Sequence, residues 1–435
     1  IMPSLVGSEM CIRDSRKALG GIAATELLEK ITKLVIDQQR ESLSILQNIE
    51  DELAEENIIF INEKEVSPGQ ENFLNQFFID KVAPALVTVI LHQKEQDLSD
   101  NIAFMVITLE IEDQGHIEPM YALIELPKEL DRFVVLPKKD GKQYVMMLDD
   151  LIRYNFHLIF NMFNYTSIEA HMVKITRDAE LDLEEDVGKS YVEKIRNSVK
   201  ERMIGDPVRL VYDKTIAEST LLFIMKKMGI SSTDSLIPGG KYHHRRDYMN
   251  FPSLNRSDLL YPEVTPLEIK GLRLDGNILK AISEKDYLLY APYHNYYYVI
   301  KFLREAALDP KVKTIKITLY RLSQNSQVVS SLINAAKNGK KVTVQIELQA
   351  RFDEKNNIIF AERLEAAGVH LIFGVPGLKV HTKICLIERE EGNKLKRYGF
   401  ISSGNFNETT AKIYTDYTLF TAHQKVLKDV GKVFG

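Results

Sequence analysis

The segments VKTIKITLYRL (312–322), QVVSSLINAAKNGK (327–340) and KVTVQIELQAR (341–351) decide the fold class of the second half of the chain. The first and third are short and rich in β-branched residues, which is typical of strands. The middle one has apolar residues at helical spacing and a glycine near its end, which favours a helix. A second helix (358–368) and a third strand (369–375) continue the pattern. Alternating strands and helices predict a mostly parallel α/β sheet.

Two arginines directly follow strands of this predicted sheet. Arg321 comes after the first strand and Arg351 after the second. Ligands of open α/β sheets bind outside the carboxyl ends of the strands, and a guanidinium fork matches the oxygens of a phosphate. Alone, each arginine could equally be a surface residue paired with an acid such as Asp353 or Glu354. Their equivalent positions favour a phosphate site.

The segment GLKVHTKICLIE (377–388) places a histidine and a lysine two residues apart on another predicted strand. Because side chains alternate along a strand, His381 and Lys383 should share a face and lie about 7 Å apart. The alternative is a core histidine bonded to the backbone. A lysine on the same face argues against that apolar environment, since lysines are rarely buried unpaired.

A turn rich in small polar residues follows in RYGFISSGNFNETTAKIYTDYTLF (397–420). Asn405 lies in this turn, and Asn407 is suited to cap a helix after it, which alone would explain that residue. H-x-K followed by G-N-x-N resembles the histidine–lysine motif of the phospholipase D superfamily, in which histidine attacks phosphorus. A neutral imidazole is a good nucleophile near pH 7, and lysine and asparagine can stabilise the oxygens of the group in transfer.

The composition narrows the class of protein. The chain has 435 residues, of which 45% are hydrophobic and 27% charged, and a net charge of −5. This is ordinary globular composition for about two to four domains, and a binding site for a polyanion would have to be clustered locally. The two cysteines, Cys11 and Cys385, form no CxxC pair, which excludes a disulfide framework and favours a reducing cytoplasm. No apolar run reaches the about 18 residues of a membrane span.

The first half of the chain has a different organisation. Apolar spacing predicts a long amphipathic helix over 25–55 and a second helix over 71–81. Strand-like segments and further helices then predict an α+β domain. The strands are expected at 85–91, 101–112, 120–127, 132–137, 143–148 and 170–183, and the helices near 187–203 and 216–228.

A basic loop ends this half. The segment PGGKYHHRRDYMNFPSLNRS (238–257) carries Lys241, His243, Arg245 and Arg246. Long loops inside compact proteins are often functional, so this loop could guide a polyanion. The alternative is an ordinary solvated basic loop.

Four motifs in the second half resemble those of one family. ITLYR (317–321), ELQARFDE (347–354), GLKVHTK (377–383) and SGNFNETTAKIYTDYTLF (403–420) look like polyphosphate kinase of the first type. GDPVRL, YMNFP and REAALDP also fit, so the resemblance covers the chain from about residue 17 onward. The resemblance implies an α/β and α+β multidomain protein with a phospholipase-D-like α/β domain.

The resemblance also implies an activity. Members of that family reversibly transfer the terminal phosphate of ATP to polyphosphate through a phosphohistidine. The resemblance therefore implies an ATP:polyphosphate phosphotransferase that uses Mg²⁺, is cytoplasmic with peripheral membrane association, and forms a homo-oligomer. No nucleic-acid partner is expected. Two alternatives stay open, a phospholipase-D-like phosphodiesterase or nuclease and a non-catalytic polyanion-binding protein.

The resemblance assigns roles residue by residue. His381 matches the phosphorylated histidine, and Lys383 and Asn405 stand beside it in the motifs. Arg321 and Arg351 match arginines near the magnesium-bound phosphates. Because a guanidinium has no lone pair for a metal, we interpret them as phosphate clamps and not as ligands. Tyr414 matches an adenine-contacting tyrosine; the alternative is a half-buried strand tyrosine.

The chain also departs from the family pattern. Phe400 stands where some members carry a second histidine, so that histidine either is not needed by this chemistry or was never the nucleophile. The family's N-terminal SNLDEFF segment and its second phospholipase-like domain have no counterpart, so we expect a fragment that holds about half an active site and is inert alone. The expected divisions are a non-native segment (1–15), a helical domain (16–82), an α+β domain (83–268) and the catalytic α/β domain (269–435).

Overall fold

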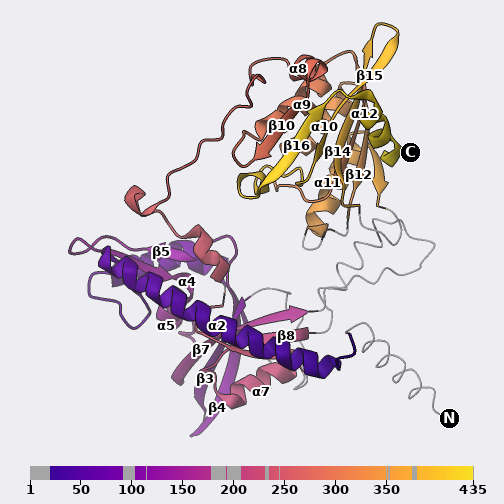
Figure 1. The fold of residues 1–435 in the computed structure, drawn as a ribbon. Helices are drawn as coiled ribbons and strands as arrows, with labels where there is room; N and C mark the ends of the chain where they lie inside the picture. The colour runs from indigo at the N-terminus through magenta and orange to yellow at the C-terminus, as the bar shows by residue number, and fades with distance from the viewer. Residues whose placement is uncertain are drawn as a thin grey trace, which may run out of the picture. The chain divides into compact units, whose positions relative to one another are not determined.

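The computed structural model describes residues 20–91, 103–113, 115–177, 193, 207–230, 235–243, 245–348, 350, 353–374 and 380–434. The chain forms two compact units (Figure 1). The described residues up to 177 and from 207 to 260 belong to the first unit, and those from 261 onward belong to the second. The suspected foreign segment 1–15 lies outside the described residues.

The first unit begins with one long helix. α2 (Ala24–Glu55) matches the predicted helix over 25–55 to within one residue. It packs on β1 (Ile58–Ile61) and β9 (Ser235–Gly239) of the same unit. None of its side chains is fully buried, and Ile31 and Leu34 of its apolar stripe are 49% and 58% exposed.

Two sheets form the body of the first unit. Their strand orders are β1-β6-β5 and β2-β4-β3-β7-β8-β9. The strands are β1 (Ile58–Ile61), β2 (Val87–Ile90), β3 (Ala103–Asp113), β4 (His116–Glu125), β5 (Phe133–Val135), β6 (Gln143–Met147), β7 (Tyr165–Arg177), β8 (Pro207–Asp213) and β9 (Ser235–Gly239). The helices are α3 (Glu71–Phe77), a π-helical continuation (Phe78–Val82), 3₁₀ turns (Ala83–Ala85, Arg245–Asn250, Ser257–Leu259), α4 (Leu148–Tyr154), α5 (Phe156–Ile159) and α7 (Glu218–Lys227).

The predicted α+β character of this unit is confirmed. β3 and β4 form one antiparallel pair, and β5 and β6 form another. The turn between β5 and β6 has positive φ at Asp140 (51°) and Gly141 (77°), as a two-residue hairpin turn requires. The helix expected near 187–203 lies outside the described residues, apart from residue 193.

The second unit is built on one seven-stranded sheet of order β10-β16-β15-β14-β11-β12-β13. The strands are β10 (Tyr287–Ala291), β11 (Val312–Leu319), β12 (Lys341–Ile346), β13 (His370–Phe373), β14 (Lys383–Glu391), β15 (Lys394–Ser402) and β16 (Asp416–Thr421). The helices are α8 (Ile278–Glu284), α9 (Tyr297–Leu308), α10 (Gln327–Lys337), α11 (Glu354–Ala366), α12 (Gln424–Gly431) and 3₁₀ turns (Thr410–Lys412, Lys432–Phe434).

The prediction of a mostly parallel sheet is wrong. β11, β12 and β13 are parallel, as their helical crossovers require. β14 pairs antiparallel with β11, and β15, β16 and β10 add three more antiparallel pairs. Only residues 392 and 393 connect β14 to β15, and so short a connection can join only antiparallel neighbours. The result is a mixed sheet with β11 and β14 at its centre.

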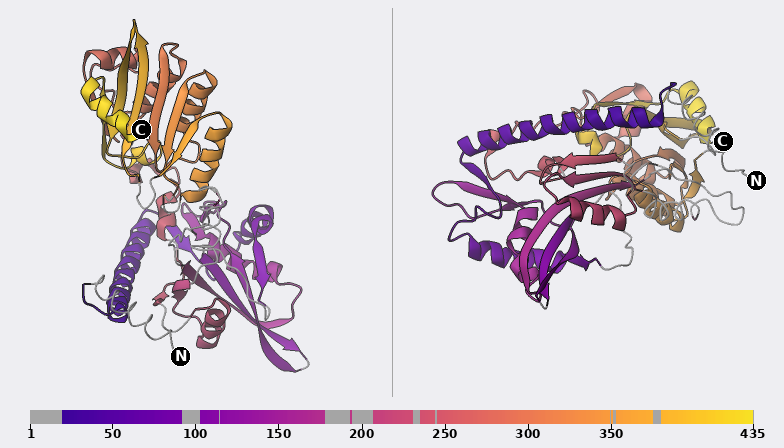
Figure 2. Two further views of the ribbon diagram at one scale, coloured as in Figure 1. Left: turned by 90° about the vertical axis from the view of Figure 1, so that its right-hand side faces the viewer. Right: turned by 90° about the horizontal axis from the view of Figure 1, so that it is seen from below.

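Helices cover both faces of this sheet (Figure 2). Cys385 and Ile387 of β14 point into the main core, which also contains side chains of α8 to α11. Ile384 and Leu386 alternate to the opposite face and pack against α12. Both faces of β14 are therefore buried, which leaves the ends of the strands for polar side chains. The domain boundaries expected at 82/83 and 268/269 stay predictions. α2 and α3, which lie before the first of these boundaries, belong to the first unit.

Candidate functional site

The end of β11 and the start of β14 lie side by side and hold the H-x-K segment between two polar anchors. The first anchor is Thr318, whose side chain is buried. Its Oγ1 donates to the carbonyl of Thr382 (2.7 Å) and accepts from the backbone N–H of Ile384 (3.1 Å). One hydroxyl thus binds the backbone on both sides of Lys383.

The second anchor precedes the histidine. The buried carboxylate of Glu347 accepts a hydrogen bond from the N–H of Val380 (2.9 Å). Asn357, fully buried, donates to the carbonyls of Glu347 (2.9 Å) and Tyr320 (2.7 Å). These contacts join the ends of β11 and β12 to the segment that carries His381.

His381 therefore lies just before β14 and not on it, which corrects the expectation of two strand neighbours on one face. β14 begins at Lys383. Side chains of Glu347 and Thr318 take the backbone groups that a ladder would otherwise use. The imidazole is exposed, and its ring lies 5.4 Å from the ring of Tyr320 at an interplanar angle of 80°. The alternative of a buried core histidine does not hold.

Lys383 is buried, with 5% of its surface exposed. Its ammonium donates to the carbonyl of His381 and lies 5.4 Å from the centre of the Tyr320 ring. Burial lowers the pKa of Lys383, the carboxylate of Asp416 acts in the opposite direction, and the charge of Arg321 lowers it further. A buried ammonium with few protein acceptors is suited to an anionic ligand.

Arg321 follows β11, as the sequence indicated, and its side chain is 44% exposed. Its Nε lies 3.1 Å from Asp353, so the predicted alternative of an ion pair with a nearby acid is present. Its guanidinium also lies 5.7 Å from the centre of the Tyr320 ring. Burial raises the pKa of Asp353, and Arg321 counteracts that shift. Arg351, the other predicted clamp, lies outside the described residues.

The turn after β15 holds the predicted asparagines. Asn407 accepts hydrogen bonds from the N–H groups of Thr409 and Thr410 (3.0 Å each), at the start of the short 3₁₀ turn Thr410–Lys412, so it serves the local fold. Asn405 differs, because its Oδ1 is buried without a hydrogen-bond partner among the described residues. Its amide is thus not fully used by the local structure.

The aromatic residues Tyr414 and Phe400 differ in their exposure to solvent. Tyr414 precedes β16 and is 63% exposed, so it is not the half-buried strand tyrosine of the alternative. Phe400, in the place of a second histidine, is fully buried against Phe302, Phe406 and Phe420. Phe400 therefore belongs to the core.

The described residues contain no group of three or more histidine, cysteine or carboxylate side chains that could hold a metal ion. In the same described part of the chain, no helix combines the length and apolarity needed to cross a bilayer.

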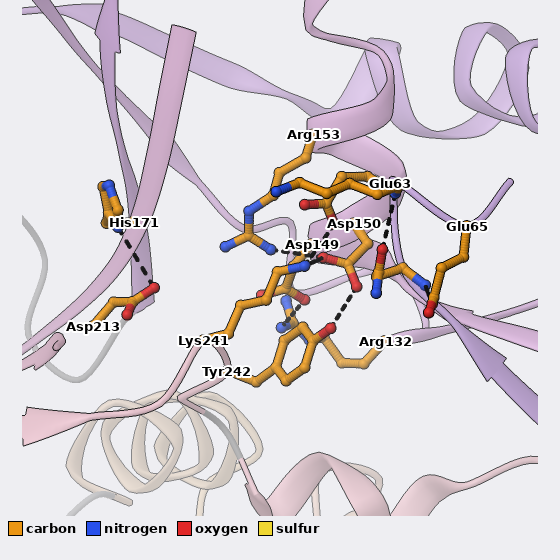
Figure 3. Close-up of polar contacts among 12 residues, drawn as sticks. Glu63, Glu65, Arg132, Asp149, Asp150, Arg153, His171, Asp213, Lys241 and Tyr242 are labelled. Atoms are coloured by element: carbon orange, nitrogen blue, oxygen red, sulfur yellow. Dashed lines mark hydrogen bonds and ion pairs between the residues drawn. The ribbon is translucent and has the colours of Figure 1, made fainter. Parts of the chain in front are cut away.

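The basic loop of the first unit is built into a buried polar cluster (Figure 3). Lys241 lies 2.5 Å from Glu63 and 2.9 Å from Asp150. Asp150 also binds Arg153 (2.8 Å) and accepts from the hydroxyl of Tyr242 (2.5 Å). Burial raises the pKa of Asp150 to about 6, with Arg153 and Lys241 opposing the shift. Lys241 therefore neutralises internal carboxylates.

Of the other three loop residues that were predicted to guide a polyanion, two contact backbone carbonyls of the first unit and one is exposed. Arg245 donates to the carbonyl of Gln39 on α2 (3.2 Å), and the His243 ring lies 3.0 Å from the carbonyl of Gly240. Arg246 is exposed. Most of the loop's positive charge thus holds the loop on the unit, and a guiding role for these residues stays a prediction.

A pocket of 700 Å³ adjoins this cluster. Its lining carries cations and carboxylates in similar number, so it has no clear charge preference. The cations are Lys64, Arg153, Lys214 and Lys241, and the carboxylates are Glu63, Glu169 and Asp213. Glu63 is paired with Lys241, and Asp213 lies 3.6 Å from His171.

The second unit thus has a mixed α/β fold that gathers histidine, lysine, arginine and asparagine at one end of its sheet, which is the composition of a phosphate-handling site. Two family models match the chain. "Polyphosphate kinase middle domain" covers residues 69–251, and "Polyphosphate kinase C-terminal domain 1" covers residues 277–435. The chain belongs to the polyphosphate kinase family.

Individual relatives agree with this assignment. The polyphosphate kinase of Vibrio parahaemolyticus is 38% identical over 96% of this chain and 60% of its own length, and that of Yersinia pestis is 38% identical over 95% and 61%. A crystal structure of polyphosphate kinase from Porphyromonas gingivalis superposes with a TM-score of 0.73 at 30% identity, over 97% of this chain and 61% of that one. The chain therefore spans about three-fifths of the length of the relatives that it matches.

The motifs alone did not reveal the supporting residues Thr318, Tyr320, Glu347 and Asn357. A signal was present, because each is a polar or aromatic residue within or next to a segment that is otherwise buried. Only the pairing of β11 with β14 brings Thr318 to the H-x-K segment. The sequence separation of these contacts hides them from local patterns.

Proposed function

We propose that this protein is an ATP:polyphosphate phosphotransferase that acts through a phosphohistidine at His381. The observation that carries the proposal is an exposed imidazole beside a buried ammonium and a partly exposed guanidinium, held on a firmly anchored segment. The names of the relatives support the substrate class. A phosphodiesterase or a polyanion-binding protein gains no comparable support.

In the first half-reaction, MgATP binds with its phosphates at Arg321. Nε2 or Nδ1 of neutral His381 forms a bond to the γ-phosphorus while the bond from phosphorus to the bridging oxygen breaks, and ADP leaves with that electron pair. Positioning and charge stabilisation carry most of such a transfer. Lys383 and Asn405 stabilise the charge that develops on the transferring group. The side-chain amine of Lys383 must be protonated for this role.

In the second half-reaction, a terminal oxygen of polyphosphate attacks the phosphorus of phosphohistidine. The P–N bond breaks, and His381 returns to its neutral form with the chain one phosphate longer. Because both half-reactions exchange phosphate between similar donors, the cycle is reversible. Arg351 is proposed as a second phosphate clamp, and the exposed ring of Tyr414 as a stacking surface for adenine.

The remaining expectations extend this proposal. Mg²⁺ comes with ATP, and Arg321 contacts its phosphates instead of the metal. Arg246 is proposed to guide the polyanion, together with Lys241, His243 and Arg245. Use of ATP and the free thiol of Cys385 favour a cytoplasmic location. Homo-oligomer formation and peripheral membrane association are expected from the family resemblance.

The test is phosphate labelling of the protein. Incubation of the full-length enzyme with γ-labelled ATP and Mg²⁺ should yield an acid-labile, base-stable protein label, and its His381→Ala variant should yield none. His370→Ala is a matched control, because it removes another exposed histidine of the same unit. Undiminished label on His381→Ala would reject His381 as the acceptor, and release of a monoester from a diester without ATP would favour a phosphodiesterase.

A further inference from the structure

Tyr320, to which the motifs assign no role, borders the three side chains on which the proposed transfer depends. Its ring lies 5.4 Å from the ring of His381 in a T-shaped arrangement. The ammonium of Lys383 lies 5.4 Å from its centre, and the guanidinium of Arg321 lies 5.7 Å from it. One aromatic ring thus borders the nucleophile and two cations.

The backbone under this ring is fixed. The carbonyl of Tyr320 accepts from the fully buried amide of Asn357 (2.7 Å). The carbonyl of the preceding Leu319 accepts from the N–H of Glu347 (2.9 Å). Glu347 in turn holds Val380, next to His381. The Tyr320 backbone and the segment that carries His381 therefore belong to the same buried hydrogen-bond network, which fixes the distance between them.

We infer that Tyr320 is a positioning residue for phosphoryl transfer, which holds the His381 imidazole by edge-to-face contact and the Lys383 ammonium over its ring. The inference rests on the proposed function. A T-shaped contact restricts rotation of the imidazole and so favours one approach to phosphorus. An ammonium near an aromatic ring is stabilised by the ring quadrupole, most strongly where water is excluded.

The charges around Lys383 give this inference a pH signature. Burial lowers the pKa of Lys383, Asp416 at the start of β16 raises it, and Arg321 after β11 lowers it. His381 faces the same amine through its carbonyl. The Tyr320 ring favours the charged amine, so loss of the ring should lower the pKa of Lys383 further. The alkaline limb of the transfer rate should then move to lower pH.

The experiment compares Tyr320→Phe, which keeps the ring, with Tyr320→Leu, which removes it. The full protein is mixed with γ-labelled ATP and Mg²⁺, and the rate of His381 labelling is followed across pH. Tyr320→Phe should stay within about twofold of the unchanged protein. Tyr320→Leu should lose about tenfold in the maximal rate, equivalent to about 1.4 kcal/mol, with ATP half-saturation unchanged. Tyr261→Leu, which removes a 99% exposed ring, is the control.

A second readout does not depend on activity. In the free protein, the imidazole protons of His381 should show a ring-current shift in the NMR spectrum that Tyr320→Phe keeps and Tyr320→Leu loses. If Tyr320→Leu unfolds, Tyr320→Met fills the space without a ring. Equal rates and equal shifts for the Phe and Leu variants would overturn the inference. Ring-current shifts that behave as expected in a protein that never labels His381 would overturn the proposed function instead.

Discussion

Substitution of Gly404 by alanine should disturb both the stability of the second unit and the ionisation of Lys383. Gly404 lies in the turn before Asn405, and its backbone has no positive φ, so a side chain causes no backbone strain. The obstacle is space. A Cβ at this position would meet Oδ2 and Cγ of Asp416 and would lie 2.7 Å from Asp416 Cβ.

The magnitude follows from that crowding. Ordinary contacts begin at 3.4 Å, so Asp416 Cβ must retreat by about 0.7 Å from its 2.7 Å position. Asp416 is held in the ladder between β16 and β10, and its Oδ1 accepts from Ser403 Oγ (2.7 Å). Overpacking of this kind costs about 1–3 kcal/mol. With a urea dependence of about 2 kcal/mol per M, the unfolding midpoint should fall by about 1 M.

The displacement also has a consequence for the site. The Asp416 carboxylate raises the pKa of Lys383, so moving it away lowers that pKa. Lys383 then loses its proton at a lower pH, and the alkaline limb of His381 labelling should shift downward in Gly404→Ala.

Urea unfolding followed by far-ultraviolet circular dichroism, together with the labelling rate against pH, measures both effects. Gly276→Ala is the matched control, because its Cβ would meet nothing closer than 3.4 Å in the same unit. Equal midpoints for the Gly404 and Gly276 variants would refute the steric argument. A lower midpoint with an unchanged pH profile would refute only the electrostatic one.

Three further predictions concern buried polar groups. Thr318→Val should lower the rate of His381 labelling and the unfolding free energy by about 1–3 kcal/mol, because two hydrogen bonds from its hydroxyl to the backbone are lost. Thr314→Val, on the same strand, should leave the labelling rate unchanged. The raised pKa of Asp150 contributes stability that is full below pH 3.8, the ordinary pKa of an aspartate, and is lost as pH rises through about 6. The unfolding free energy of the unchanged protein, relative to that of Asp150→Asn, should therefore fall over that pH range. Chemical denaturation at several pH values measures this difference. Cys385 is fully buried, and burial raises the pKa of its thiol. In a Cys11→Ser background, iodoacetamide should therefore leave Cys385 unmodified until urea unfolds the protein. Rapid alkylation of the native protein would contradict its burial.

Local patterns in the sequence were sufficient for the elements that depend on nearby residues. The long helix α2, the crossovers of β11, β12 and β13, and the turn at Asp140 follow from apolar spacing and turn chemistry, which act over a few residues. The H-x-K and G-N-x-N motifs likewise marked the segments that form the candidate site.

Contacts between distant segments decided the rest. Pairing of β14 with β11 makes the sheet mixed, and it brings the Thr318 hydroxyl to the backbone on both sides of Lys383. The apparent basic loop loses most of its free charge because Lys241 meets Glu63, which lies far away in the sequence. Tyr320 gains its proposed role only because folding brings it between an imidazole and an ammonium. Such contacts depend on which strands become neighbours, and periodicity along one segment carries no information about that choice.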